Sequence, residues 1–352
     1  MPIKDTLNLE DIIGITSEIA EKLRSKSIFT VEALAITTPR ELVEIVGAIR
    51  LKSPKSDRQI AFNEDIARTF IQNAREKIDI KFMTAKDLME HRKTVRFLTT
   101  GVNAINDILG GGYEAQALTE LGGSYGSGKT NLSVLACVTV QLPEEKGGLD
   151  GGAIFIDTES TFRPENVSRC AKRLGLMPSK VMDRILYGDA FNSAHQMLMV
   201  QRLDKQIKEI NAKLIVVDSL TSHFRAEYIG RETLPPRQQN LNAHIHMLLK
   251  WAKVFNLVCI VTTQVHARPD QMWNPPPELA NPAVGGHVLA HGATHRLYLR
   301  TGSKNTRIVK VYDSPNLPPR EATFIITGEG SMDVPAEDKK TEGKTETPTT
   351  PS

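Results

Sequence analysis

Apolar residues in the first part of the chain recur every three or four positions. Ile12, Ile15 and Ile19 form one such series, and this spacing is typical of helices that bury one face. Polar stretches and turn residues separate the series from one another. The pattern therefore predicts a small all-α domain over residues 1–78, followed by a linker over residues 79–96.

From residue 97 the pattern changes to short apolar runs separated by helical stretches. Strands that alternate with helices indicate a parallel sheet with helices on both faces. After residue 296 the runs follow one another closely, so we expect antiparallel strands at one edge. The predicted fold class is α/β, with a mostly parallel central sheet over residues 97–334. The predicted strands are residues 118–121, 153–157, 185–187, 214–218, 258–263, 296–300, 307–313 and 322–326.

The last segment, residues 335–352, is rich in Lys, Glu, Thr and Pro and has little to bury, so we expect it to be disordered. Composition favours a soluble protein without a membrane partner, because no apolar run approaches the roughly 20 residues that span a bilayer. The start of the chain lacks a secretory signal, and three widely spaced cysteines favour reduced thiols. A cytoplasmic location is therefore expected. A net charge of +3 is too small to indicate a nucleic-acid partner, which local sites must reveal.

Residues 123–130 match the phosphate-binding loop pattern, and they lie between an apolar strand and an apolar helix, the context that this pattern requires. This context disfavours the alternative of a glycine-rich turn without a ligand. Loop amides at the helix N-terminus are expected to hold the β-phosphate of ATP. Lys129 would reach the β- and γ-phosphates, and the Thr130 hydroxyl would take one Mg²⁺ position. The predicted nucleotide-binding residues are Gly123, Ser124, Tyr125, Gly126, Ser127, Gly128, Lys129, Thr130 and Asn131.

Two carboxylates are expected at the same edge of the sheet, where ligands of open α/β sheets bind. Asp218 ends a predicted buried strand, from which an aspartate reaches Mg²⁺ directly or through water. Glu159 follows the strand of residues 153–157 and is the candidate for polarising the attacking water. The alternative for Glu159 is an exposed loop glutamate without a catalytic role.

Several longer runs carry a resemblance to a known family. With the phosphate loop, residues 155–165, 218–231, 234–239 and 312–318 make the chain resemble the archaeal RadA group of the RecA family of DNA recombinases. The match covers residues 8–333. It implies a RecA-like P-loop ATPase core and a helix-hairpin-helix N-terminal domain. It also implies self-association into a ring or helical filament, with ATP between neighbouring subunits and DNA near the axis.

The resemblance assigns Arg225 and Arg231 to a first DNA loop, and it places Arg237 at the start of the next helix. Arginines near glycine neutralise phosphates without reading bases, which suits a protein that must accept any sequence. The alternative is a solvated face that binds no DNA.

The resemblance identifies residues 266–282 as a second DNA loop. This segment is too long and irregular for a compact domain unless it is functional or disordered. Met272 and Trp273 would wedge against or stack on bases there. The alternative for Trp273 is packing on the domain surface.

Further roles in the nucleotide site come from the resemblance alone. Gln264 would respond to the γ-phosphate and transmit its presence to the second DNA loop, and His291 would sense the same phosphate from the neighbouring subunit. Asp313, Ser314 and Pro315 resemble a cap that covers ATP across the interface. The aspartate of this cap would also hold a monovalent cation such as K⁺.

Two short motifs precede the core. Phe82 and Ala85 in the linker resemble a polymerisation motif that inserts into pockets of the next subunit, although such a motif also occurs by chance. Gly14 and Thr16 resemble the turn of a helix-hairpin-helix element, whose amides would hold a duplex phosphate. A purely structural turn is the alternative.

The chain departs from the family pattern at four positions and in one insertion. Ser124 replaces an acidic residue, Asn131 a glutamine, Asn166 the arginine that lies against adenine, and Thr263 an asparagine. The insertion lies within residues 51–63. These changes preserve the Lys, Thr, Asp and Glu chemistry and admit a divergent paralogue.

The function expected from the resemblance is that of an ATP-dependent homologous recombinase. It would assemble on single-stranded DNA, bind double-stranded DNA and exchange strands in DNA recombination and repair, with recombination mediators as partners at the nucleoid. One alternative is an accessory ATPase that loads a recombinase without exchanging strands. Another is a hexameric ATPase that binds no DNA, which should lack the arginine-bearing loop and the polymerisation motif.

Overall fold

The computed structural model describes residues 8–335, apart from residues 27, 29, 48, 53–58, 78–82, 231, 265–288, 290, 291 and 304. Contacts divide the chain after Thr94 into two units, and each unit has its own hydrophobic core. None of the helices in these described stretches is long and apolar enough to cross a bilayer. The cysteines, Cys137, Cys170 and Cys259, are buried and unpaired.

The N-terminal unit is helical, as its apolar spacing predicts. Threonine side chains begin three of its helices: Thr16, Thr30 and Thr38 each accept a hydrogen bond from an amide three residues later, which satisfies an otherwise unpaired donor. The elements are η1 (Leu9–Asp11), α1 (Ser17–Ser25), α2 (Val31–Ile36), α3 (Pro39–Val46), β1 (Arg50–Lys52), β2 (Gln59–Ala61), α4 (Glu64–Lys77) and α5 (Ala85–Arg92).

The all-α prediction for this unit did not include strands β1 and β2. They pair antiparallel, with Leu51 opposite Ile60, and they flank the polar stretch around Pro54 within the predicted insertion. Each strand has only three residues, so an apolar alternation long enough to predict a strand does not develop.

In the second unit, nine of the described strands form one sheet, in the order β13-β12-β11-β10-β5-β9-β8-β6-β7. Strands β10, β5, β9, β8, β6 and β7 run parallel, and β11, β12 and β13 extend the sheet antiparallel. These strands are β5 (Leu118–Gly123), β6 (Gly152–Asp157), β7 (Ile185–Asp189), β8 (Ala212–Asp218), β9 (Val258–Gln264), β10 (His295–Thr301), β11 (Thr306–Asp313), β12 (Glu321–Thr327) and β13 (Gly330–Asp333). The predicted α/β class and all eight predicted strands are present.

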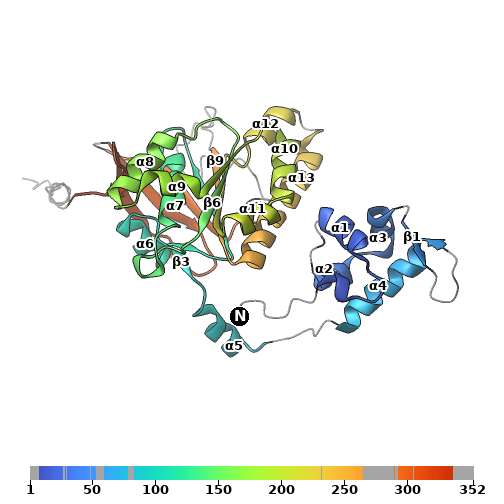
Figure 1. Cartoon of the computed structure of the whole chain (residues 1–352). Helices are drawn as coiled ribbons and strands as arrows, with labels where there is room; N and C mark the ends of the chain where they lie inside the picture. Colours follow the sequence, from blue (N-terminus) through green and yellow to red (C-terminus); the bar gives the residue numbers. More distant parts are fainter. Residues whose placement is uncertain are drawn as a thin grey trace, which may run out of the picture. The chain divides into compact units, whose positions relative to one another are not determined.

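Helices cover both faces of this sheet, with α6 to α9 on one side and α10 to α13 on the other (Figure 1). Every residue of β5 and β6 is buried, as expected for parallel strands covered on both faces. The helices are α6 (Asn103–Leu109), α7 (Lys129–Thr139), α8 (Pro164–Arg173), α9 (Pro178–Asp183), α10 (Ser193–Gln201), α11 (Asp204–Glu209), α12 (Ser222–Glu227) and α13 (Leu234–Phe255), with η2 at Glu144–Lys146. The short strands β3 (Phe97–Leu98) and β4 (Tyr113–Glu114) pair separately.

Candidate active site

The carboxyl ends of four neighbouring parallel strands bring the predicted nucleotide residues to one edge of the sheet. Strands β5, β9, β8 and β6 lie side by side in that order. Gly123 pairs with Gln264 at the ends of β5 and β9, and Asp157 pairs with Asp218 at the ends of β6 and β8. This edge is the ordinary ligand-binding position of an open α/β sheet.

The phosphate loop requires its glycines for two different reasons. Gly126 (φ +74°) and Gly128 (φ +100°) have left-handed backbone conformations, which side chains with a Cβ rarely adopt. Gly123 has no space for a side chain, because a Cβ there would lie 2.3 Å from the carbonyl oxygen of Leu299. The loop therefore turns sharply into α7, and Ser124, Tyr125 and Gly126 are exposed at its crest.

Lys129 is buried at the start of α7, and its ammonium holds the loop closed. Its Nζ donates to the carbonyl oxygens of Gly123 and Ser124, at 2.9 Å each. Burial lowers the pKa of Lys129, while the carboxylates of Asp218 and Glu159 oppose that shift. Since an ammonium has three donors, one N–H remains for a phosphate oxygen.

Asp218 lies in a buried position beside the first turn of α7. Burial raises the pKa of the Asp218 carboxyl, and hydrogen bonds from Thr262 and Thr130 oppose the shift. Thr262 donates its hydroxyl proton to Asp218 Oδ1, and Asp218 Oδ2 has no hydrogen-bond partner within the described parts of the chain. A buried carboxylate with a vacant oxygen next to a threonine hydroxyl is suited to a divalent cation.

Glu159 stands opposite Gln264 across the end of β8. Gln264 Nε2 donates to both carboxylate oxygens of Glu159, at 2.9 and 3.0 Å. Asp157 fixes the turn that carries Glu159, because its Oδ1 accepts the Glu159 amide at 3.0 Å and its Oδ2 accepts the Phe162 amide at 2.9 Å. Glu159 is therefore held in place and is not a free loop glutamate.

The residues present fit ATP with Mg²⁺. The Ser127 hydroxyl and Asp218 Oδ2 are buried polar atoms without a hydrogen-bond partner in the described structure. Burying an unpaired polar atom costs free energy unless a ligand or water forms a hydrogen bond with it. Together with the N-terminus of α7 and Lys129, they provide anion contacts and a cation ligand at one place. The phosphate loop, Lys129, Thr130 and Asp218 would hold the group, and bound Mg²⁺ would supply charge neutralisation at the phosphates.

The proposed cap residues lie at the opposite end of the strands from the phosphate loop. Strand β11 runs antiparallel to β10, and Asp313 pairs with Arg296 near the start of β10, whereas the phosphate loop follows the end of β5. The length of the strands, about 3.3 Å per residue and roughly 20 Å in total, separates Asp313, Ser314 and Pro315 from the phosphate loop of the same chain. His291 lies outside the described residues.

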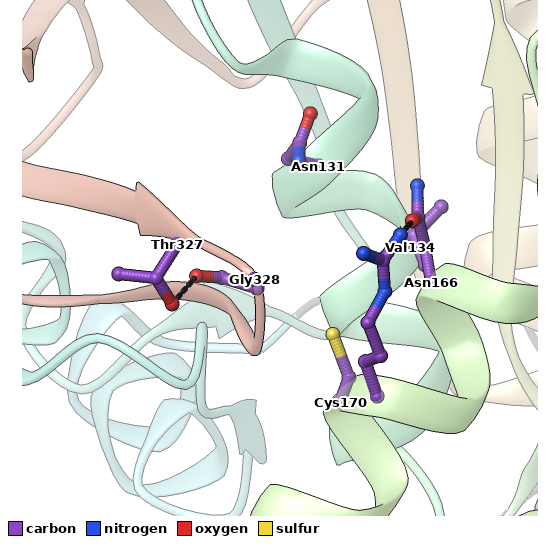
Figure 2. A pocket seen from close by; sticks show the side chains of 8 residues that line it. Asn131, Val134, Asn166, Cys170, Thr327 and Gly328 are labelled. Atoms are coloured by element: carbon purple, nitrogen blue, oxygen red, sulfur yellow. Dashed lines mark hydrogen bonds between the residues drawn. The ribbon is translucent and has the colours of Figure 1, made fainter.

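Two departures from the family pattern line one small cavity beside α7. The cavity has a volume of about 80 Å³ and lies between α7, α8 and the turn from β12 to β13. Figure 2 shows Asn131 on the first turns of α7 and Asn166 on α8 at this cavity. Arg169 donates to Asn166 Oδ1. The third departure, Thr263, is buried and donates to Glu120 Oε1 at 2.6 Å, and the fourth, Ser124, is exposed in the loop.

The arginines predicted to bind DNA lie beyond the end of β8. Arg225 is on α12, Arg237 is on the first turn of α13, and both are partly exposed. Neither side chain makes an ion pair or hydrogen bond with any residue that the structure describes. Arg231, Met272 and Trp273 lie outside the described residues.

In the N-terminal unit, Gly14 adopts φ +94° and Thr16 is the N-cap of α1. A Cβ at Gly14 would lie 2.6 Å from Phe70 Cε1, so this turn is fixed by packing as well as by conformation. Ala85 is the first residue of α5 and is exposed. Phe82 lies outside the described residues.

Sequence reasoning missed an apolar cavity beside the edge strand β7. It has a volume of about 330 Å³ and is lined by residues of β6, β7, α10 and α11. Two of the side chains that line the cavity are unusually exposed to solvent for apolar groups: Tyr187 is 48% and Leu198 is 42% exposed. Residues on four separate elements form it, so no local motif could reveal it.

Sequence reasoning also missed Thr262. Its signal was present, because the apolar run of β9 ends in the polar series Thr262, Thr263 and Gln264, which are the last residues before the active edge.

The family model described as Rad51 matches residues 91–334, which is more than half of the chain and includes every element from β3 to β13.

Proposed function

Because the chain belongs to the Rad51 family, whose members are DNA-dependent ATPases that form filaments on DNA, we propose that it is an ATP-dependent homologous recombinase. In this proposal the protein assembles on single-stranded DNA, pairs it with a homologous duplex and exchanges strands. The exchange breaks and forms base pairs only. ATP binding stabilises the assembly on DNA, and hydrolysis releases it.

The observation that carries the proposal is the hydrogen-bonded pair of Glu159 and Gln264. Glu159 is the residue that would orient the attacking water, and Gln264 is the last residue of β9 before the segment that resembles the second DNA loop. A single side-chain contact therefore joins the hydrolytic carboxylate to the start of the proposed DNA loop. This connection supports coupling between nucleotide state and DNA affinity.

Within the site, each residue has a separate task. Lys129 and the loop amides bind the phosphates, and Thr130 and Asp218 orient the cation. Glu159 holds the attacking water through its carboxylate, while Gln264 fixes the position of that carboxylate. Asn131 and Asn166 would border the nucleoside, since their cavity adjoins the same turn of α7.

The cap residues support a site that is completed by two copies of the chain. The cap lies at the opposite end of the strands from the phosphate loop of the same chain. Its residues Asp313, Ser314 and Pro315 are therefore too far away to cover a nucleotide bound there. They would instead cover the nucleotide of a neighbouring copy, where Asp313 would also hold K⁺.

The apolar cavity at β7 supports the same assembly. An aromatic side chain fits into an apolar cavity of this size, and burying it stabilises an interface by roughly 1.5–3 kcal/mol. We propose that Phe82 of one copy enters this cavity in the next copy, while Ala85 contacts the rim. Leu198 and Tyr187 are exposed there, as an interface side chain would be before assembly.

On the DNA side, Arg225, Arg237 and Arg231 would contact phosphates, and Met272 and Trp273 would contact bases. Gly14 and Thr16 would hold a duplex phosphate in the N-terminal unit. Two measurements test these roles: ATP hydrolysis with and without single-stranded DNA, and DNA affinity over a range of salt concentrations. Each single-strand phosphate contact contributes about 0.7 to the slope of log K against log salt. DNA-independent hydrolysis without measurable DNA binding would instead support the ATPase that binds no DNA.

A further inference from the structure

Three polar side chains meet at the end of the strands that lies opposite to the phosphate loop. Glu114 is the last residue of β4, His295 is the first residue of β10, and Ser314 follows β11. His295 Nε2 lies 3.0 Å from a carboxylate oxygen of Glu114, and His295 Nδ1 lies 3.0 Å from Ser314 Oγ. The side chains of His295 and Glu114 are only 4% and 8% exposed. Water therefore has little access to the imidazole, which joins the two other groups.

The hydrogen bonds around Ser314 determine where the protons lie. Ser314 Oγ accepts the amide of Leu317 at 3.1 Å and that of Asn316 at 3.4 Å, which uses both of its lone pairs. Its own proton then points to His295 Nδ1, the nearer of its two acceptors; the other is Asn316 Oδ1, at 3.3 Å. His295 Nε2–H donates to Glu114. Both ring nitrogens of His295 are therefore engaged, one by Glu114 and one by Ser314.

These bonds fix the backbone of an otherwise exposed turn. Pro315 and Asn316 are exposed, while Leu317 packs against the hydrophobic core. Ser314 anchors one end of the turn through His295, and Leu317 anchors the other. The turn therefore has a defined shape without any ligand bound to it.

Apolar side chains would fill the same volume without the desolvation cost of a buried carboxylate and imidazole. A purely structural role therefore does not require these three residue types. A role in holding Ser314 at a set position explains them, because directional hydrogen bonds define such a position.

We propose that His295 is a positioning residue for the part of the nucleotide site that one copy of the chain presents to the next. Through Ser314 it holds residues 313–315 in the shape that covers the neighbour's nucleotide, and Glu114 fixes the orientation of the imidazole. The proposal rests on the proposed function, since it requires ATP to lie between two copies.

The test is complementation between two defective variants in one mixture. His295→Ala keeps an intact phosphate loop but presents a displaced turn, whereas Lys129→Ala lacks phosphate binding but presents an intact turn. We expect His295→Ala alone to weaken ATP affinity in the DNA-bound assembly by about tenfold, the effect of losing roughly one net hydrogen bond. Mixing the two variants should restore ATP hydrolysis above the sum of the separate activities.

A second readout needs no nucleotide. Amide hydrogen exchange of residues 313–317 should become faster in His295→Ala, while that of the phosphate loop stays unchanged. Ser314→Ala removes the same hydrogen bond from a more exposed position and should give the same results if His295→Ala folds poorly. His246→Ala, which changes an exposed histidine of α13, is the matched control and should behave like the wild type.

Wild-type ATP affinity in both His295→Ala and Ser314→Ala would overturn the proposal. So would a folded His295→Ala variant whose defect persists when it is mixed with Lys129→Ala. Failure of the wild-type protein itself to assemble or hydrolyse ATP on DNA is a different result, and it would overturn the proposed function instead.

Discussion

Gln264 Nε2 donates to both carboxylate oxygens of Glu159, at 2.9 and 3.0 Å. The two residues come from strands that are not neighbours, since β8 lies between β9 and β6. The bond therefore spans the edge of the sheet where the nucleotide is proposed to bind. A movement of the chain that displaces Gln264 would therefore change the position of the Glu159 carboxylate.

Gln264→Ala should uncouple hydrolysis from DNA. The Glu159 carboxylate remains but loses the contact that fixes its position, so hydrolysis should fall both with and without DNA, and the stimulation by DNA should fall as well, by about tenfold or more. The measurement is kcat with and without a single-stranded oligonucleotide. Gln201→Ala, at an exposed position on α10, is the control. Full stimulation of the Gln264 variant would show that this contact does not carry the coupling.

Lys129→Ala should abolish nucleotide binding and strand exchange without unfolding the protein. Burial lowers the pKa of Lys129, which means that keeping the ammonium charged inside the folded protein costs free energy. Removing the side chain relieves that cost but also removes two hydrogen bonds to the loop carbonyls, so the thermal unfolding temperature should change little. Equilibrium binding of a fluorescent ATP analogue and circular dichroism measure the two effects. ATP binding of wild-type strength would contradict the assignment of the loop.

Phe82→Glu and Leu198→Glu should each prevent assembly. The first places a charge on the inserted side chain, and the second places one at the rim of the cavity beside β7, where desolvation of a carboxylate opposes docking. Sedimentation with ATP, Mg²⁺ and DNA should detect monomers. Met177→Glu changes an apolar side chain that is 59% exposed elsewhere on the surface and should leave assembly unchanged. Filaments formed by Leu198→Glu would exclude the cavity as the acceptor.

His244 should make the core less stable in mild acid. Gln196 Nε2 lies 3.1 Å from His244 Nε2 inside the protein, and burial lowers the pKa of His244 to about 4. The unfolded chain takes up this proton near pH 6.5, so stability is retained above that pH and is lost as the pH falls toward 4, by roughly 3 kcal/mol.

Denaturant unfolding at pH 7.5 and 4.5 measures this loss. His244→Gln should reduce the difference between the two free energies of unfolding, whereas His246→Gln, at an exposed position on the same helix, should not. An unchanged difference in the His244 variant would mean that other groups determine the acid sensitivity.

The sequence was informative wherever a local pattern determines the structure. The phosphate loop, the strand that ends in Asp218 and the turn that carries Glu159 are contiguous runs, and their apolar context predicted one edge of a parallel sheet. Contacts between distant segments left no such trace. The cavity beside β7 and the cluster at His295 each join residues that are far apart in the chain. Thr262 itself was visible in the polar end of β9, but its contact with Asp218 was not. The strands β1 and β2 were missed because they are too short for an apolar alternation to develop.

The position of the cap could not be predicted either, because it depends on the direction of β11 in the sheet. The resemblance gave the run from Asp313 to Pro315 a role across the subunit interface, but it did not give the end of the strands at which the run lies. Strand register places it away from its own phosphate loop, and that geometry is the physical argument for a site built by two copies.

The formation of joint molecules between single-stranded DNA and a homologous duplex tests the central claim most directly. The account predicts joint molecules with ATP and Mg²⁺, or with a non-hydrolysable ATP analogue, and none without nucleotide or with a heterologous duplex. DNA-stimulated ATP hydrolysis without joint molecules under any of these conditions would contradict it and would identify an accessory ATPase.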